Sequence, residues 1–363
     1  MPLKTTAGTH GEVVKGRGAP INIEGRFEEW QRESSEDGWF QDAPEEPLRL
    51  KTVVHLERAK SVISRHDSPD VGFSQSINPY RGCAHGCTYC FARPSHAYLG
   101  LSPGLDFETR LSAKVNAAEK LREEISKPSY RCEPLTIGVN TDAYQPIERQ
   151  YQVTRSILEV ASETHHPVSL ITKSALVERD LDLLAPMAKK HLVAVTLSVT
   201  TLDHHLSMKM EPRTSAPARR LLAIKRLSEA GVPVNVNVAP VIPFLTDSEL
   251  EPIMEAAAQN GAVSAGYVLV RLPWEVRPIF KEWLEKHFPL KAEHVMSRIR
   301  DMRDGRENDP DFGSRMVGTG TLAELLAQRY RKAVKRFGLD RDIHDLDCNL
   351  FVPPSRSGQG SLF

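Results

Sequence analysis

The chain has few cysteines, few aromatic residues, no long apolar run and no excess of charge. Its 363 residues include 5 cysteines and 7% aromatic residues, and 47 basic side chains balance 47 acidic ones. So few cysteines, three of them clustered, exclude the dispersed set of a disulfide-rich secreted protein. No apolar run reaches the roughly 18 residues of a membrane-spanning helix, and the amino terminus lacks a signal-peptide core. We therefore expect a cytoplasmic protein without a membrane partner, in which nucleic-acid binding needs a local basic patch.

The chain is long enough to bury one large core with appendages. Residues 1–70 contain few apolar positions and show no sustained period, which indicates an N-terminal arm that is largely irregular or disordered. We expect a core domain at 71–272, a helical extension at 273–340 and a flexible tail at 341–363.

Within the core, short apolar segments alternate with longer amphipathic ones. Strands are predicted at 74–79, 134–140, 168–172, 192–199, 232–239 and 263–271. Helices are predicted at 108–126, 152–164, 175–190, 217–230 and 246–260, and further helices at 275–304 and 318–337. Six strands separated by helices indicate an α/β fold with a parallel sheet.

Three of these strands have one apolar and one polar face. In 193–199, for example, Val193, Val195 and Leu197 alternate with Thr196 and Ser198. A parallel sheet covered by helices on both faces would be apolar on both. The polar face therefore indicates the hydrated lumen of a partial (β/α)6 TIM-like barrel, and function is expected at the carboxyl ends of its strands.

The most informative motif is Cys83-x3-Cys87-x2-Cys90, directly after the first predicted strand. Three thiolates can hold an iron–sulfur cluster while leaving one iron without a protein ligand, whereas four would close it. The alternative is a zinc-binding, non-enzymatic protein in which His85 completes the ligand set. His85 lies inside the first cysteine loop, however, and structural zinc sites typically pair their cysteines as Cys-x2-4-Cys.

With Tyr89 before its last cysteine, this motif resembles that of the radical S-adenosylmethionine superfamily. The resemblance implies a [4Fe-4S] cluster on the three cysteines, with S-adenosyl-L-methionine bound to the open iron. An electron donor would then drive cleavage of this cofactor to a 5'-deoxyadenosyl radical, which abstracts hydrogen from a substrate. The protein would supply positioning and exclude water.

Over about residues 75–270, the order of strands and helices resembles spore photoproduct lyase and its relatives. That resemblance implies repair-like chemistry on DNA, although radical chemistry on RNA, protein or a small molecule remains an alternative. It also implies that Tyr89 reaches the adenine of S-adenosylmethionine through backbone atoms. Further cofactor contacts are implied at Thr141, Asp142, Lys173 and Ser198. For Asp142 and Lys173, the residues alone leave open a loop cap and a solvated side chain.

The chain departs from the lyase at two positions, and no residue is identified as catalytic. Val139 and Asn140 stand where the lyase has a cysteine before its Ser/Thr-Asp pair, and Phe91 stands where it has a tyrosine. These departures argue against the lyase's own reaction. Cys132 is a poor substitute for the missing cysteine, because it precedes a predicted strand and so lies at the opposite end of the barrel.

Basic residues occur in two further places. Arg213, Arg219 and Arg220 follow the fourth predicted strand, and they either hold a carboxylate or phosphate or form a charged helix start that faces water. The basic residues of 318–337 are interpreted as a solvated face.

The last five residues, Gln359-Gly360-Ser361-Leu362-Phe363, resemble the pentapeptide by which bacterial repair proteins dock on the sliding clamp. The pattern prefers leucine where this chain has Gly360. Two apolar side chains on a flexible tether can act as anchors in a partner's pocket. A sliding clamp is therefore a predicted partner, with chance similarity as the alternative.

Overall fold

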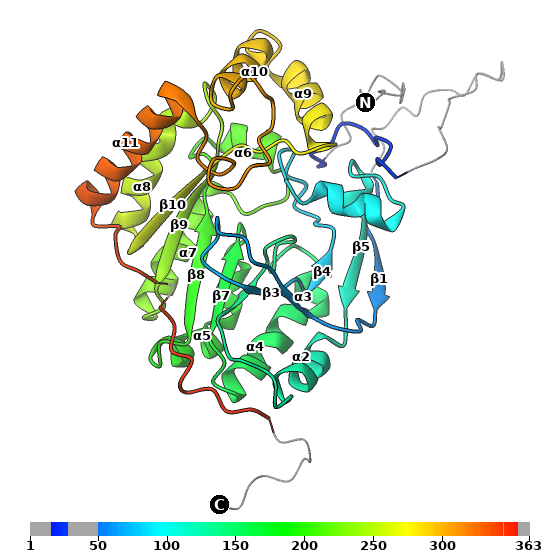
Figure 1. Cartoon of the computed structure of the whole chain (residues 1–363), viewed down its shortest axis with the longest axis vertical. Coiled ribbons are helices and arrows are strands. Elements are labelled where there is room, and N and C mark those ends of the chain that lie inside the picture. The colour runs from blue at the N-terminus through cyan, green and yellow to red at the C-terminus, as the bar shows by residue number, and fades with distance from the viewer. Residues whose placement is uncertain (1–15, 28–49, 344, 355–363) are drawn as a thin grey trace, which may run out of the picture.

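The structure, a computed structural model, describes residues 16–27, 50–343 and 345–354. Its main sheet has seven strands, and six of them lie side by side in parallel and in sequence order (Figure 1). In spatial order the strands are β10 (Ser264–Leu269), β9 (Val234–Val241), β8 (Val193–Ser198), β7 (Val168–Thr172), β6 (Leu135–Ile137), β3 (Gln75–Ile77) and the antiparallel β2 (Ile63–Arg65). Among the described residues this sheet does not close, so the predicted partial barrel is confirmed.

Helices follow the parallel strands, and the apolar residues between them and the sheet form the main core, where Leu135, Val195 and Ile224 are fully buried. The longer ones are α2 (Ala117–Ile125), α4 (Val153–Glu163), α5 (Leu181–Ala188), α7 (Pro217–Glu229) and α8 (Leu250–Gln259). The shorter ones are η1 (Arg93–Leu99), α1 (Asp106–Thr109), α3 (Glu148–Tyr151), η2 (Ala175–Asp180), α6 (His204–Met210) and η3 (Asp247–Glu249).

The opposite face of the sheet is polar, as the alternation predicts. The strand register places Thr136 beside Ser169 and Thr196 beside Asn235, and these side chains are buried. The Asn235 amide donates a hydrogen bond to the Thr196 hydroxyl over 3.4 Å. The strands therefore form a polar lumen that can hold a hydrophilic cofactor.

A second sheet lies beside the barrel, in the order β1 (Val53–Glu57), β5 (Arg110–Lys114) and β4 (Tyr80–Arg81). The prediction of one helix over 108–126 was wrong at its start, because residues 110–114 pair with two strands that are distant in the sequence. The described part of the N-terminal arm contributes β1 and β2, so ordered strands occur there.

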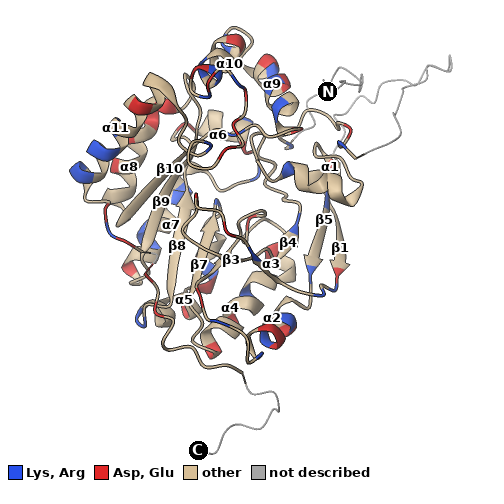
Figure 2. Ribbon diagram, in the orientation of Figure 1, with Lys and Arg blue, Asp and Glu red and all other residues tan. Residues whose placement is uncertain are grey.

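The predicted helix at 275–304 is two helices, α9 (Val276–His287) and α10 (Ala292–Asp301). Pro289 lies between them and cannot donate the hydrogen bond that a continuous helix needs. The last helix, α11 (Gly320–Phe337), packs against α8, where Arg329 pairs with Glu251 at 2.6 Å. Figure 2 shows acidic and basic positions intermixed along α9 and α10, whereas the basic positions of α11 lie towards its C-terminal end. None of the described helices is both long and apolar enough to cross a membrane.

Candidate active site

The cysteine motif forms a loop after β4, at the carboxyl ends of the parallel strands. Cys83 and Cys87 are buried and Cys90 is partly buried. Backbone hydrogen bonds fix the loop at both ends, from the Cys83 amide to the Phe107 carbonyl (2.9 Å) and from the Thr88 amide to the Met210 carbonyl (3.0 Å). Burial raises the pKa of all three thiols. A metal would supply the positive charge that such thiols need to ionise, so the donor set fits an iron–sulfur cluster.

A buried ion pair between Arg93 and Glu108 supports the loop from outside. Arg93 also donates to the carbonyl of Cys87 over 2.9 Å, so the pair is connected directly to a cysteine of the motif. The Glu108 carboxylate accepts the amides of Gly18 (3.0 Å) and Ala19 (2.7 Å). The N-terminal segment is therefore bound to the cysteine loop through one carboxylate.

Gly18 lies directly against the backbone of this loop. A Cβ atom at Gly18 would come within 1.7 Å of the carbonyl oxygen of Gly86 and within 3.3 Å of the Thr88 methyl group. Gly86 has a φ of +70°, a conformation that glycine adopts without strain. Both glycines are thus needed for the close contact between the N-terminal segment and the loop.

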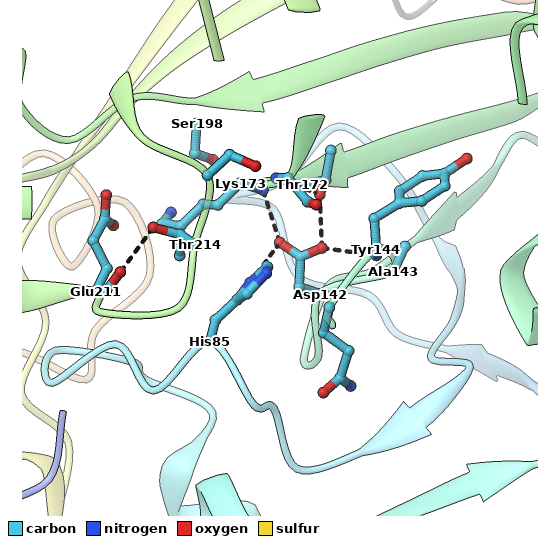
Figure 3. A network of polar contacts seen from close by, with 12 residues as sticks. His85, Asp142, Ala143, Tyr144, Thr172, Lys173, Ser198, Glu211 and Thr214 are labelled. Carbon is cyan, nitrogen blue, oxygen red and sulfur yellow. Dashed lines mark hydrogen bonds and ion pairs between the residues drawn. The ribbon is translucent and has the colours of Figure 1, made fainter. Parts of the chain in front are cut away.

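Asp142 connects the loop to the barrel (Figure 3). Its carboxylate accepts the Thr172 hydroxyl (2.6 Å) and the amides of Lys173 (2.7 Å) and Tyr144 (2.8 Å), and it lies 3.3 Å from His85 Nδ1. Burial would raise the pKa of Asp142, but His85 and these hydrogen bonds lower it to about 2. Asp142 is therefore a carboxylate that joins β7 to the cysteine loop, and through Tyr144 it also caps its own turn.

The position of His85 bears on the zinc alternative. Its ring lies against Asp142, whereas that alternative needs it as a ligand beside the three thiols. Within the described ranges, no group of three or more histidine, cysteine or acidic residues is arranged to hold a single metal ion. A cubane cluster binds each cysteine through a different iron, so its ligands need not converge on one point.

Tyr89 points away from the surface into a buried polar network. Its hydroxyl donates to Glu211 and lies 3.2 Å from the Thr200 hydroxyl. Glu211 is also paired with Arg220, and both side chains are completely buried. Burial would raise the pKa of Glu211, but Arg220 and Lys173 lower it, so the group remains a carboxylate.

The remaining predicted cofactor contacts lie around this network. Lys173 donates from Nζ to the Ala239 carbonyl over 3.3 Å, and its ammonium is 5.9 Å from the centre of the Tyr89 ring. Ser198 is buried at the end of β8, and its carbonyl accepts a hydrogen bond from Arg220 over 3.0 Å. The Thr141 hydroxyl donates to the Tyr80 carbonyl over 3.3 Å. The fold thus gathers these residues at one edge of the sheet.

The three arginines after β8 do not form one anion-binding group. Arg220 is buried with Glu211, and Arg219 pairs with Glu178 at 2.7 Å. Arg213 is exposed and contacts the Thr52 hydroxyl over 3.4 Å. Two of the three are therefore committed to carboxylates of the chain itself.

Several site residues were missed by the sequence analysis. Gln145 donates to the Gly82 carbonyl over 3.1 Å and accepts the Ala84 amide over 2.8 Å, which holds the start of the cysteine loop. Arg93, Glu108 and Glu211 also support the loop. Glu108 and Glu211 bind partners 90 and 122 residues away, whereas the partners of Arg93 lie within 15 residues. For His85, its place between two cluster cysteines was a signal, but it was interpreted only as a zinc ligand.

Comparison with known proteins agrees with this geometry. The sequence model of the Radical SAM superfamily matches residues 77–257, which include the cysteine loop and five of the six parallel strands, in part or whole. The chain belongs to the radical SAM superfamily. Enzymes of this superfamily use a [4Fe-4S] cluster and S-adenosylmethionine, and the chain is accordingly a radical SAM enzyme.

Relatives occur in bacteria and archaea. The chain is 35% identical over 285 residues to the uncharacterized protein Rv2578c of Mycobacterium tuberculosis, which covers 77% of this chain and 82% of that protein. It is 27% identical over 251 residues to the uncharacterized protein MJ0683 of Methanocaldococcus jannaschii, covering 69% and 90%.

Among solved structures, the radical SAM fold is shared with spore photoproduct lyase. The lyase complexed with dinucleoside spore photoproduct has a TM-score of 0.58 at 16% identity, covering 78% of this chain and 79% of the lyase. A lyase mutant with bound AdoMet and the same dinucleoside has a TM-score of 0.51 at 17% identity, with 79% of each chain covered. At this identity the likeness shows the fold alone.

Proposed function

We propose that the chain is a radical SAM enzyme that acts on DNA, in a reaction related to repair. Cys83, Cys87 and Cys90 would hold the [4Fe-4S] cluster, because they are three thiols in one loop at the carboxyl ends of the strands. When bound, the cluster and S-adenosylmethionine supply a 5'-deoxyadenosyl radical for hydrogen abstraction, with an external electron donor. The chain's own residues position these groups and keep water out of a buried site.

Four residues, Tyr89, Thr141, Lys173 and Ser198, are proposed to contact S-adenosylmethionine, and Asp142 is proposed to act beside them. Thr141, Lys173 and Ser198 are supported by their polar groups at neighbouring strand ends next to the cysteine loop. Asp142 already accepts three hydrogen bonds from the chain, so its proposed part is to position Lys173 and the loop. Tyr89 is proposed to reach the adenine by its backbone, because its hydroxyl is occupied by Glu211.

The observation that favours a nucleic acid is a group of aromatic side chains and arginines beside the cluster loop. Phe91 follows Cys90, is 44% exposed, and has the Arg271 guanidinium 5.6 Å from its ring centre. Trp274, three residues after Arg271, is 59% exposed, and the Arg26 guanidinium lies 4.4 Å from its ring centre. Exposed aromatic rings with arginines are stacking surfaces for unpaired bases.

Arg271 has the features of a residue that binds a ligand. Its Nε atom is buried and has no hydrogen-bond partner among the described residues. Burial and the nearby Arg315 lower the pKa of Arg271, while Asp70 and Asp309 partly offset them. The residue is partly exposed and its guanidinium lies against the exposed Phe91 ring, so Arg271 is proposed to contact the DNA through its terminal nitrogens.

The test is an anaerobic reaction of the reconstituted enzyme with dithionite and S-adenosylmethionine, in which 5'-deoxyadenosine is measured with and without damaged DNA. We expect damaged DNA to stimulate product formation and Cys87→Ser to abolish it. If the formation of 5'-deoxyadenosine does not depend on DNA, this result would support the alternative that the substrate is RNA, protein or a small molecule.

Binding is measured separately, with a fluorescent single-stranded oligonucleotide. Stacking contributes about 1–3 kcal/mol per base, so Phe91→Ala and Trp274→Ala should each weaken binding by about 5- to 150-fold. Leu290→Ala is the matched control, because this apolar side chain is exposed elsewhere on the surface. Equal affinity of all three variants would contradict DNA binding at this surface.

The proposed sliding-clamp motif, Gln359 to Phe363, lies outside the described residues and stays a prediction. We expect deletion of these five residues to abolish binding to a purified clamp while 5'-deoxyadenosine formation is unchanged. Clamp binding that survives the deletion, or that the intact chain never shows, would remove this partner.

A further inference from the structure

Two cysteines outside the cluster loop lie in contact with each other. Cys132 precedes β6, at the end of the sheet opposite to the cluster, and Cys348 belongs to the C-terminal segment, residues 345–354. The two thiols lie close enough for each to shift the pKa of the other. Both side chains are partly exposed, so reagents in solution can reach them. Residues far apart in the sequence are thus placed as a dithiol.

A neutral histidine, His166, lies beside this pair. Its Nδ1 lies 3.0 Å from the Pro167 carbonyl, which can only accept, so the ring carries its proton on Nδ1. Burial lowers the pKa of His166 to about 4, and the neutral ring therefore presents Nε2 as an acceptor. This atom is 3.8 Å from Cys132 Sγ and 2.7 Å from the Tyr130 hydroxyl. The single lone pair of Nε2 is therefore engaged by Tyr130, and the neutral His166 ring packs beside Cys132.

The C-terminal segment crosses the amino ends of the strands and is drawn in red in Figure 1. The Asp347 amide donates to the His191 carbonyl, and the Val352 amide donates to the Thr164 carbonyl, each over 2.9 Å. Phe351 packs against the rings of Tyr130 and His166, with ring centres 5.8 and 5.0 Å away. A covalent bond at Cys348 would fasten this segment to the barrel permanently.

We propose that Cys132 and Cys348 form a redox site, in which oxidation to a disulfide fastens the C-terminal segment to the barrel. The oxidant is a small-molecule disulfide. The Cys132 thiol gives its proton to solvent, and its thiolate attacks the oxidant, which releases one thiol as the mixed disulfide forms. Cys348 then displaces the second thiol, so two protein thiols are oxidised and one disulfide is reduced to two thiols.

The resting pair is expected to react slowly. Burial raises the pKa of Cys132 to about 12, which keeps the sulfur protonated at neutral pH. Attack requires the thiolate, so the reaction needs an excess of oxidant or an oxidising change in the surroundings. The site would thus remain a dithiol under reducing conditions, and the disulfide would record sustained oxidation.

The test treats the full chain, with its cluster reconstituted under nitrogen, with excess oxidised glutathione. We expect intact mass spectrometry to show the loss of two hydrogens, peptide mapping to show a Cys132–Cys348 crosslink, and dithiothreitol to reverse both. Exclusion of oxygen protects the cluster, and iron content is measured in parallel. Glutathione adducts without a crosslink, or a crosslink to a cluster cysteine, would overturn the proposal.

Variants separate the redox site from simple packing. Cys132→Ser and Cys348→Ser should each abolish the crosslink while iron content and circular dichroism match those of the unmodified chain. Crosslinking of the unmodified chain should accelerate as pH rises, because attack requires the thiolate, and a rate that does not depend on pH would contradict this step.

A metal-bound pair is the competing outcome. If one zinc ion per chain protected both cysteines from glutathione, and Cys348→Ser removed this zinc, the disulfide proposal would be wrong. Reconstitution with iron and sulfide alone, followed by zinc analysis, makes this distinction. DNA dependence and 5'-deoxyadenosine formation are not part of the readout, so the redox site is tested independently of the proposed function.

Discussion

At the carboxyl ends of the strands three cysteines lie in one loop, whereas at the amino ends Cys132 and Cys348 come from segments far apart in the sequence. The loop cysteines are surrounded by charged groups, including the Arg93–Glu108 pair and Asp142. The pair at the other end has a neutral histidine and aromatic rings beside it. The same side chain is thus placed among charged groups at one end of the barrel and beside neutral rings at the other.

The largest effect is expected when one cysteine at either end of the barrel is replaced by serine. Cys87→Ser should lose nearly all reconstituted iron and sulfide, because a cubane with two cysteine ligands is exposed on two irons. Cys132→Ser should retain the full amounts. Iron and sulfide analysis after anaerobic reconstitution measures both, and equal retention would show that Cys87 is not a ligand.

The second effect concerns the ion pair behind the cluster loop. Arg93→Leu leaves Glu108 buried without its partner, which is expected to cost about 3–5 kcal/mol in the free energy of unfolding. Arg298→Ala removes an exposed partner of Asp301 and should change it by less than about 1 kcal/mol. Urea unfolding of the metal-free chains compares the two. A small effect of Arg93→Leu would mean that Glu108 finds solvent or another donor.

The third effect is the pH dependence of stability that His166 contributes at the amino ends of the strands. His166 has its pKa lowered to about 4 by burial, whereas an unfolded histidine titrates near 6.5. The unfolded chain therefore binds a proton first, and stability should fall by up to about 3 kcal/mol as pH decreases from 6.5 to 4. His166→Gln should lose this component of the pH dependence. Identical slopes for the two chains between these pH values would refute the assignment.

The smallest effect is expected at the contact between the N-terminal segment and the loop. Gly18→Ala forces a methyl group against the Gly86 carbonyl and should destabilise the chain by about 1–3 kcal/mol, with some loss of iron. Gly72→Ala is the control, because its added methyl group meets nothing within 4 Å. If both variants unfold at the same urea concentration, the segment does not stabilise the loop.

Most of the barrel could be predicted from the sequence, because its strands alternate with helices. The hydrophobic pattern that identifies each strand or helix lies within that element. The same reasoning failed for residues 110–114, where pairing with β1 and β4 overrides the helical pattern. The single predicted helix over 275–304 ended at Pro289, a signal that was present in the sequence and was not used.

The residues of the candidate site also fall into two groups, those with a local sequence signal and those whose partners are distant in the sequence. Cys83, Cys87 and Cys90 are visible in the sequence because their spacing is short, and the strand ends at Thr141, Lys173 and Ser198 follow from the fold. Partners such as Glu108 for Gly18, or Cys348 for Cys132, depend on how distant segments pack. Nothing in the local sequence specifies these contacts, so a single sequence could not reveal them.

The contact of Gly18 and Ala19 with Glu108 also has a consequence for the order in which this face forms during synthesis. The two amides precede their carboxylate by 90 and 89 residues. At about 5–20 residues per second, the ribosome makes the N-terminal segment roughly 5–20 seconds before its partner exists. The three cysteines, in contrast, emerge almost together. The loop, however, is fixed by the Met210 carbonyl, which is made more than 100 residues after Glu108, so the covering segment finds its carboxylate before the loop has all its partners.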